Sequence, residues 1–144
     1  MTAPPALLYV EDEQSDVLLF RFAVTRVGLT NPVHIVGDGA QAIDYLAGNG
    51  PFADRNAHPL PALVLLDLNL PKKSGFEVLR WIRQQPRFLA LPVVIYTSSV
   101  GLVDKDTARL LGATDYFVKQ SGLKQLVELV RSLAQRWLTP SASP

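Results

Sequence analysis

Runs of apolar residues alternate along this chain with segments whose apolar side chains follow helical spacing, and this alternation limits the fold more than any other feature. The clearest run is Ala62-Leu63-Val64-Leu65-Leu66, which contains no polar residue. A continuous apolar run of this kind is typical of a strand buried on both faces of a sheet. We expect strands over residues 6–10, 32–36, 62–66, 91–96 and 115–118.

Amphipathic segments fill the intervals between these runs and predict helices over residues 14–28, 39–48, 75–85, 103–112 and 122–138. Residues 49–61 contain three prolines and predict a long loop. Strands that alternate with helices pair in parallel through right-handed crossovers. The sequence therefore predicts an α/β fold, a doubly wound five-stranded parallel sheet of the flavodoxin-like (βα)5 type with strand order 2-1-3-4-5.

Length and composition narrow the class of protein. The chain has 144 residues, 48% of them apolar, which suits a single domain over residues 1–138, followed by a short tail, 139–144, that we expect to be disordered. It has no cysteine, so disulfides and thiolate metal sites are excluded, and His34 and His58 lack the spacing of metal ligands.

Charge and hydropathy bear on the partners and the location of the protein. The net charge of +1 predicts no general affinity for nucleic acid or for a membrane surface. No apolar run is long enough to span a bilayer, and no basic segment precedes the first apolar run as it would in a signal peptide. We therefore expect a cytoplasmic protein.

Polar residues with complementary chemistry end the predicted strands. Glu11 and Asp12 follow the first run, Asp67 follows the third, Thr97 closes the fourth and Lys119 the fifth. Ligands of doubly wound sheets bind outside the carboxyl ends of the strands, and neighbouring strands lie only about 4.8 Å apart. Carboxylates, a hydroxyl and an ammonium gathered there predict a site that binds a hard cation and accepts a phosphoryl group.

The chain at this point resembles the receiver domains of bacterial two-component response regulators over residues 6–138. The residues that carry the resemblance are Glu11-Asp12, Asp67-Leu68-Asn69-Leu70-Pro71 with Gly75, Thr97-Ser98, and Tyr116-Phe117-Val118-Lys119. The stretch LLDLNLPKKSGFEVL and the long insertion before it are more narrowly similar to the single-domain regulators that work with bacterial phytochromes.

The resemblance implies a role for each of the matched residues. Asp67 would be the phosphoacceptor, and Mg²⁺ would be held by Asp12, by Asp67 and by the backbone carbonyl of Asn69, with Glu11 acting through water. Thr97 would bind a phosphoryl oxygen, and Lys119 would pair first with the carboxylate and then with the phosphoryl group. Tyr116 would be the switch aromatic, which moves inward when Thr97 is drawn toward the phosphoryl group.

These roles imply a signalling protein rather than an enzyme, because the chain would catalyse only its own phosphorylation and dephosphorylation. The phosphoryl donor would be a histidine kinase, and a phytochrome-type kinase on the narrower resemblance. The output would be a changed surface over the fourth helix, fifth strand and fifth helix. A homodimer could form through that surface or through the last helix, where Leu126, Leu133 and Trp137 belong to a wide apolar stripe.

One residue departs from the family pattern. Receivers usually carry a proline directly after the lysine, joined by a cis bond, whereas Gln120 follows Lys119 here. A cis bond without proline costs about 2.5–4 kcal/mol. Either this bond is trans and the following loop takes another path, or strain is held at this point.

Other functions remain open from the residues alone. The protein could pass its phosphoryl group on to a histidine phosphotransfer protein. A phosphatase similar to the haloacid dehalogenases would need a second acid where Asn69 stands, and a flavin carrier would be repelled by the acids after the first strand. A DNA-binding regulator would need a helix-turn-helix, for which we expect no room after residue 138.

Overall fold

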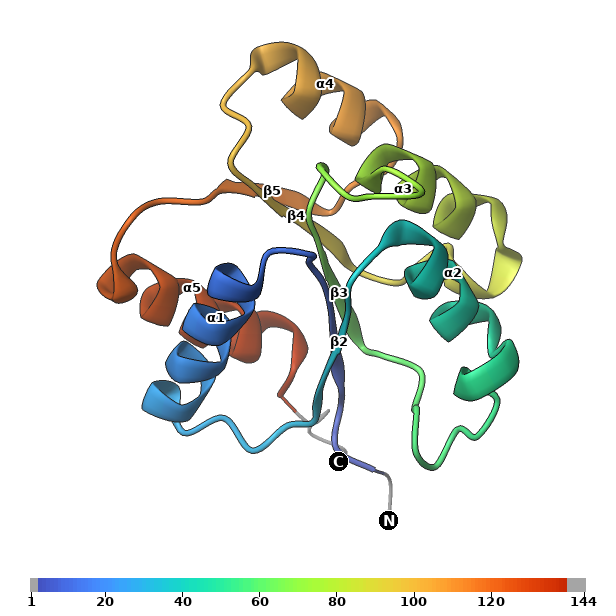
Figure 1. The fold of residues 1–144 in the computed structure, drawn as a ribbon, viewed down its shortest axis with the longest axis horizontal. Helices are drawn as coiled ribbons and strands as arrows, with labels where there is room; N and C mark the ends of the chain where they lie inside the picture. The colour runs from blue at the N-terminus through green and yellow to red at the C-terminus, as the bar shows by residue number, and fades with distance from the viewer. Residues whose placement is uncertain (1–2, 140–144) are drawn as a thin grey trace.

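The computed structural model describes residues 3–139 and contains one five-stranded sheet (Figure 1). The strands are β1 (Leu7–Val10), β2 (Val33–Val36), β3 (Leu63–Leu66), β4 (Val93–Thr97) and β5 (Asp115–Val118). All neighbours pair in parallel, in the order β2-β1-β3-β4-β5. The predicted fold class and strand order are confirmed. The expected end of the domain at residue 138 stays a prediction, and residues 140–144 of the expected tail lie outside the described part of the chain.

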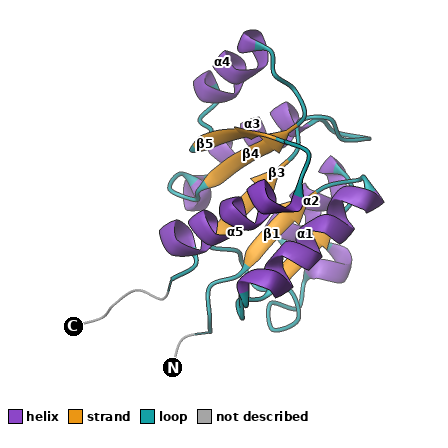
Figure 2. Cartoon of the chain, turned by 90° about the vertical axis from the view of Figure 1, so that its left-hand side faces the viewer, coloured by secondary structure: helices purple, strands orange, loops and turns teal. Residues whose placement is uncertain are grey.

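Helices cover both faces of the sheet. They are α1 (Gln14–Val27), α2 (Gly39–Ala47), α3 (Gly75–Gln84), α4 (Leu102–Leu110) and α5 (Leu123–Trp137). Helices α1 and α5 lie side by side on one face (Figure 2), and α2, α3 and α4 contribute to the core on the other. Each predicted helix is present, with ends within two residues of the expected ones.

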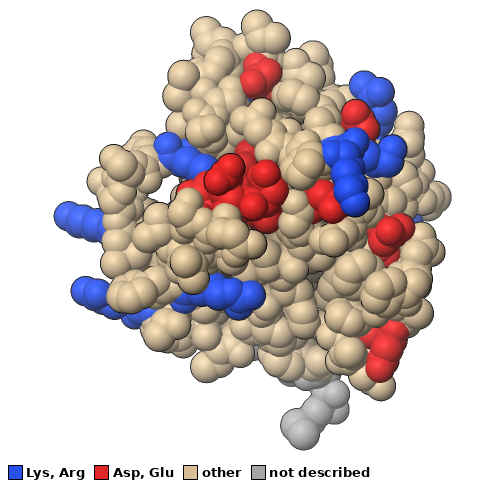
Figure 3. Space-filling view, viewed as in Figure 1, with Lys and Arg blue, Asp and Glu red and all other residues tan. Residues whose placement is uncertain are grey.

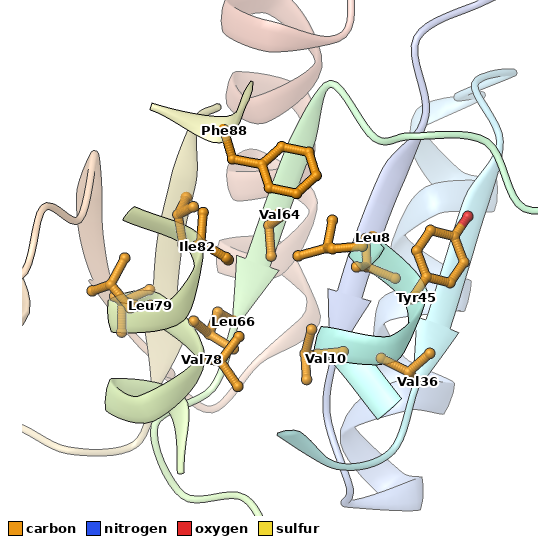
Figure 4. Close-up of a cluster of buried hydrophobic side chains, with 14 of the residues drawn as sticks. Leu8, Val10, Val36, Tyr45, Val64, Leu66, Val78, Leu79, Ile82 and Phe88 are labelled. Carbon is orange, nitrogen blue, oxygen red and sulfur yellow. The ribbon is translucent and has the colours of Figure 1, made fainter. Parts of the chain in front are cut away.

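Two apolar cores explain why the central strands are apolar throughout. Leu8 and Val10 of β1 point into the core beneath α2 and α3 (Figure 4), whereas Leu7 and Tyr9 point into the core beneath α1 and α5. Successive side chains of a strand face opposite sides of the sheet, so a strand with helices on both sides has no position for a solvated residue. Polar residues on these strands therefore appear only where the strands end.

Close backbone contacts fix the loop between β3 and α3. A Cβ on Gly75 would lie 2.2 Å from the carbonyl oxygen of Asp67, and a Cβ on Gly39 would lie 2.0 Å from that of Lys73. Only glycine permits such an approach. Ser74 then begins α3 by accepting a hydrogen bond from the backbone of Glu77 at 3.2 Å. The loop that carries Asp67 is thus held by its own backbone.

The long loop before β3 packs on the edge of the sheet. It includes a short 3-10 turn at Gly50–Phe52. The Arg55 guanidinium donates hydrogen bonds to carbonyl oxygens of Tyr45 and Leu46 at the end of α2. His34 of β2 and His58 of the loop have ring centroids 6.3 Å apart. Burial, with His58 nearby, lowers the pKa of His34. Both histidines pack as part of the edge of the sheet.

The last helix requires a correction. Leu126 and Leu133, expected on a possible partner interface, are 6% and 1% exposed and belong to the core beneath α1 and α5. Helix α5 packs against both the sheet and α1, so a wide apolar stripe is needed within the single chain. Trp137 is half-buried, with the Arg136 guanidinium 4.0 Å from the centre of its ring.

Candidate functional site

Three carboxylates converge at the carboxyl ends of β1 and β3. One oxygen from each of Glu11, Asp12 and Asp67 lies within 4.8 Å of the others. Acidic atoms gather in one patch near the centre of the face shown in Figure 3. The sequence prediction that the acids after the first and third strands meet is confirmed, because β1 and β3 are hydrogen-bonded neighbours in register.

Asp67 is held in place although its side chain is nearly buried. The residue is 4% exposed, and its backbone N–H donates to the carbonyl of Val10 on β1 at 3.2 Å. One carboxylate oxygen accepts a hydrogen bond from the backbone N–H of Asn69 at 3.2 Å. Asn69 is exposed and lines the same hollow. A carboxylate buried at a strand end and reachable from an open hollow is placed to react with a ligand.

Glu11 is the most buried of the acids, at 1% exposed. Its oxygens accept hydrogen bonds from the Tyr9 hydroxyl at 3.0 Å and from the Glu13 backbone at 3.2 Å. Burial raises the pKa of Glu11 to about 7; the hydrogen bond from Lys119 opposes this rise and the charge of Asp67 adds to it. Tyr9 was not singled out from the sequence, where it looks like any strand aromatic.

Lys119 connects the acids. Its ammonium donates to Glu11 at 2.5 Å, to Asp16 at 2.8 Å and to Asp67 at 3.0 Å. Burial alone would lower its pKa, but the hydrogen bonds to these three carboxylates outweigh that effect and raise the pKa above its usual value. The aromatic ring of Tyr96 lies 5.7 Å from the ammonium. The predicted meeting of Lys119 with Asp67 is confirmed.

Asp16 was missed by the sequence reasoning. It lies in the first turn of α1, where an acid is ordinarily explained by the helix dipole. The signal that could have found it is its place in the first turn of the helix that follows the first strand: helical side chains lean toward the helix N-terminus, which here means toward the strand ends. Periodicity alone could not show that it meets a lysine from the far end of the chain.

Thr97 and Tyr116 lie on the adjoining strands β4 and β5. Thr97 is fully buried, and its hydroxyl oxygen accepts a long hydrogen bond of 3.4 Å from the backbone of Ser99. The Tyr116 hydroxyl donates to the carbonyl of Ser99 at 3.1 Å, and the Ser99 hydroxyl donates to Asp104 at 2.6 Å. The loop between β4 and α4 is therefore tied to both neighbouring elements, and the roles of Thr97 and Tyr116 as switch residues stay predictions.

The hollow above these acids has a volume of about 430 Å³ and opens to solvent. Its polar lining includes Asp12, Glu13, Asp16, Asp67, Asn69, Lys119 and Gln120. Within the described residues no peptide bond is cis, so the bond between Lys119 and Gln120 is trans. Of the two possibilities left open by the sequence, the structure has the unstrained bond.

The donor set suits a hard divalent cation. The three converging acids offer only oxygen ligands, and the open hollow leaves room for water to complete a coordination shell. A buried carboxylate, a bonded ammonium and a group of acids suited to a cation lie together at the switch between β1 and β3. This arrangement suits the transfer of a phosphoryl group to an aspartate.

Comparison with known proteins identifies the family. The model of the response regulator receiver domain matches residues 7–131. The chain belongs to this family. Receiver domains bind a divalent metal and take part in two-component signalling with histidine kinases, through phosphorylation of an aspartate.

Individual relatives align over almost the whole chain. Response regulator Rcp1 of Synechocystis is 34% identical over 98% of this chain and 94% of its own length, and a solved structure of Rcp1 contains Mn²⁺. The probable methanogenesis regulatory protein FilR2 of Methanothrix harundinacea is also 34% identical, over 98% of this chain and 88% of its own. The phosphorylated cyanobacterial phytochrome response regulator RcpA has a TM-score of 0.86 at 34% identity and covers 99% of both chains.

Proposed function

We propose that this protein is a phosphoacceptor response regulator that receives a phosphoryl group on Asp67 from a histidine kinase. The observation that carries the proposal is the ammonium of Lys119 bonded at 3.0 Å to Asp67, beside two further acids whose oxygens lie within 4.8 Å of one another and of Asp67. Such a constellation serves to neutralise charge around a carboxylate that reacts with a phosphoryl group.

The reaction divides between Asp67 and its neighbours. An oxygen of the Asp67 carboxylate attacks phosphorus, the new O–P bond forms, and the N–P bond of the donor phosphohistidine breaks with its electron pair returning to the imidazole. Lys119 supplies positive charge to the reacting oxygens, and the Thr97 hydroxyl donates to a phosphoryl oxygen. Mg²⁺ would be held by Asp12, Asp67, the Asn69 carbonyl and, through water, Glu11, and it would neutralise charge on the carboxylates and phosphoryl oxygens.

The chain acts on itself and is not an enzyme toward other substrates. A phosphatase of this chemistry needs an acid two residues after the reacting aspartate, and the residue two positions after Asp67 is Asn69. Its output is a changed surface over α4, β5 and α5. The hydrogen bond between Tyr116 and Ser99 joins β5 to the loop that precedes α4. Because Ser99 is also bonded to Thr97, a movement of Thr97 would shift both β5 and α4.

The kinase partner is of the phytochrome type. RcpA is a phytochrome response regulator, and two further solved structures similar to this chain are bacteriophytochrome response regulators. All three cover at least 97% of this chain. FilR2, a probable methanogenesis regulatory protein, is equally identical to this chain, so the type of kinase has to be tested by phosphotransfer. Phosphotransfer to this chain from a phytochrome kinase, faster than from an unrelated histidine kinase, would support the assignment, and equal rates would contradict it.

Exposed apolar residues and net charge bear on the other partners: a second copy of the chain, a membrane and nucleic acid. Leu102, Val103 and Leu110 of α4 are 77%, 77% and 87% exposed, which supports a homodimer through the α4-β5-α5 face after phosphorylation. Among residues 3–139, no helix has the length and hydropathy needed to cross a membrane. The net charge of +1 supports a protein without nucleic-acid or membrane-surface partners, and we propose a cytoplasmic location.

Beryllofluoride, a mimic of the phosphoryl group, tests the site and its output together. We expect wild type with Mg²⁺ to bind it and to shift amide NMR signals around Asp67 and across α4, β5 and α5. Asp67→Asn should abolish both effects while retaining the fold. Binding that is unaffected by Asp67→Asn would refute the proposed phosphoacceptor. Sedimentation of the same samples reads out the homodimer, and a monomer at every concentration would refute it.

A further inference from the structure

Asp16 is the one acid bonded to Lys119 that the carboxylate cluster does not include. Glu11 and Asp67 both belong to the cluster, whereas Asp16 comes from the first turn of α1 and stands outside it. Its side chain is 32% exposed, against 0% for Glu11 and 6% for Asp67. Asp16 therefore lies at the mouth of the hollow, where it can keep its bond to Lys119 when the inner acids are otherwise engaged.

The ammonium has no spare donor. A lysine ammonium has three N–H groups, and here they have three carboxylate acceptors at 2.5, 2.8 and 3.0 Å. A new hydrogen bond to a phosphoryl oxygen therefore requires that one of these be given up. Likewise, an oxygen bonded to Lys119 is less available to a cation, because the two positive charges compete for the same lone pairs.

We propose that Asp16 is a positioning residue for Lys119: it holds the ammonium at the mouth of the hollow when a divalent cation takes the oxygens of Glu11 and Asp67, and it competes for the ammonium with a phosphoryl group on Asp67. The inference rests on the proposed function. Asp16 in this role favours cation loading and limits the stability of the phosphorylated state. It acts on the reaction only through Lys119.

The Asp16→Asn variant should therefore have opposite effects on two ligands. Without the carboxylate, Lys119 turns to Glu11 and Asp67, and the dissociation constant for Mg²⁺ should rise about two- to fivefold, the upper range for one partly exposed charged contact. At saturating Mg²⁺, the freed N–H donor should tighten beryllofluoride binding by a similar factor. Titration calorimetry measures both constants.

Matched variants distinguish loss of the contact between Asp16 and Lys119 from the loss of one negative charge near the site. Glu13→Gln removes an equal charge from an exposed neighbour that lines the same hollow, and it should change either constant less than twofold. Asp16→Glu should restore wild-type values. In a Lys119→Gln background, Asp16→Asn should have no more effect than Glu13→Gln. Equal effects of Asp16→Asn and Glu13→Gln, or an undiminished effect without Lys119, would overturn the inference.

A measurement without any ligand keeps the inference distinct from the proposed function. In metal-free protein, the ¹⁵N-detected hydrogen exchange of the Lys119 ammonium should be severalfold faster in Asp16→Asn than in wild type or Glu13→Gln, because one acceptor is lost. Unchanged exchange would overturn the role of Asp16. Wild-type protein that binds neither Mg²⁺ nor beryllofluoride, but shows the exchange difference, would overturn the proposed function alone.

Discussion

Glu11 should make the metal-free protein less stable as the pH rises from 5 to 8. The pKa of Glu11 is raised from its ordinary value of 4.5 to about 7 in the folded protein. Between these two values the folded chain holds a proton that the unfolded chain has released. A group of this kind stabilises the fold at low pH, and the contribution is lost as the pH rises through the folded-state pKa.

The size of the effect follows from the shift. One pKa unit corresponds to about 1.4 kcal/mol, so the change in unfolding free energy between pH 5 and pH 8 should be about 2.5 kcal/mol. Lys119 does not cancel it, because its pKa is raised from an ordinary value already above this window and it stays charged throughout. Glu11→Gln removes the titration but keeps the shape of the protonated acid.

Urea unfolding in the presence of EDTA measures the effect. Relative to wild type, Glu11→Gln should gain about 2.5 kcal/mol of stability between pH 5 and pH 8. The matched control is Glu128→Gln on α5, which removes an exposed acid and should track wild type at both pH values. If the difference between wild type and Glu11→Gln is the same at pH 5 and pH 8, the burial argument for Glu11 is refuted.

Three further predictions concern the loops and surfaces around the site. Gly75→Ala should lower the free energy of unfolding in urea by about 1–3 kcal/mol and weaken Mg²⁺ binding, because its Cβ would lie 2.2 Å from the carbonyl oxygen of Asp67. In the control Gly101→Ala, the added Cβ would meet nothing closer than 3.8 Å, so stability should hardly change. Thr97→Ala should still accept phosphate from acetyl phosphate but lose the NMR shifts over α4; full shifts would count against the switch. Leu18, Leu19 and Phe22 are exposed apolar residues of α1, and Leu19 lines the hollow, so we expect the kinase to dock there. Phe22→Ala should therefore slow transfer from the kinase but not from acetyl phosphate, and Leu110→Ala on α4 should slow neither.

The sequence predicted those parts of the structure that one element determines by itself. The run at residues 62–66 reads as a strand because it is apolar throughout, and Leu63–Leu66 are indeed buried; Asp67 stands out because it follows that strand. The order of strands follows from topology, and the order brings β1 next to β3. Glu11, Asp12 and Asp67 could therefore be placed together without coordinates.

The sequence could not show how two elements share a surface. Leu18 and Phe22 are as apolar as Phe20, yet they are 67% and 58% exposed, and Phe20 is fully buried. Helix α5 shows the converse case, because its wide stripe is shared between the sheet and α1, so Leu133 is buried. Periodicity shows which side chains share a face of one helix. Which edge of an apolar face stays exposed depends on the elements that pack against that helix.

The same limit applies to the site: its reacting residues could be found from the sequence, but the residues that tune them could not. The reacting groups lie at the ends of adjoining strands, where topology alone collects them, and they can be assigned from their order in the chain. Asp16 and Tyr9 act on Lys119 and Glu11 from positions that look ordinary, a first helical turn and the interior of a strand. Since these contacts decide how the charges of Lys119 and Glu11 are shared, receivers with the same reacting residues can differ in cation affinity and phosphoryl lifetime. Asp16 is the residue through which this chain would show that difference, because its removal leaves every reacting group in place.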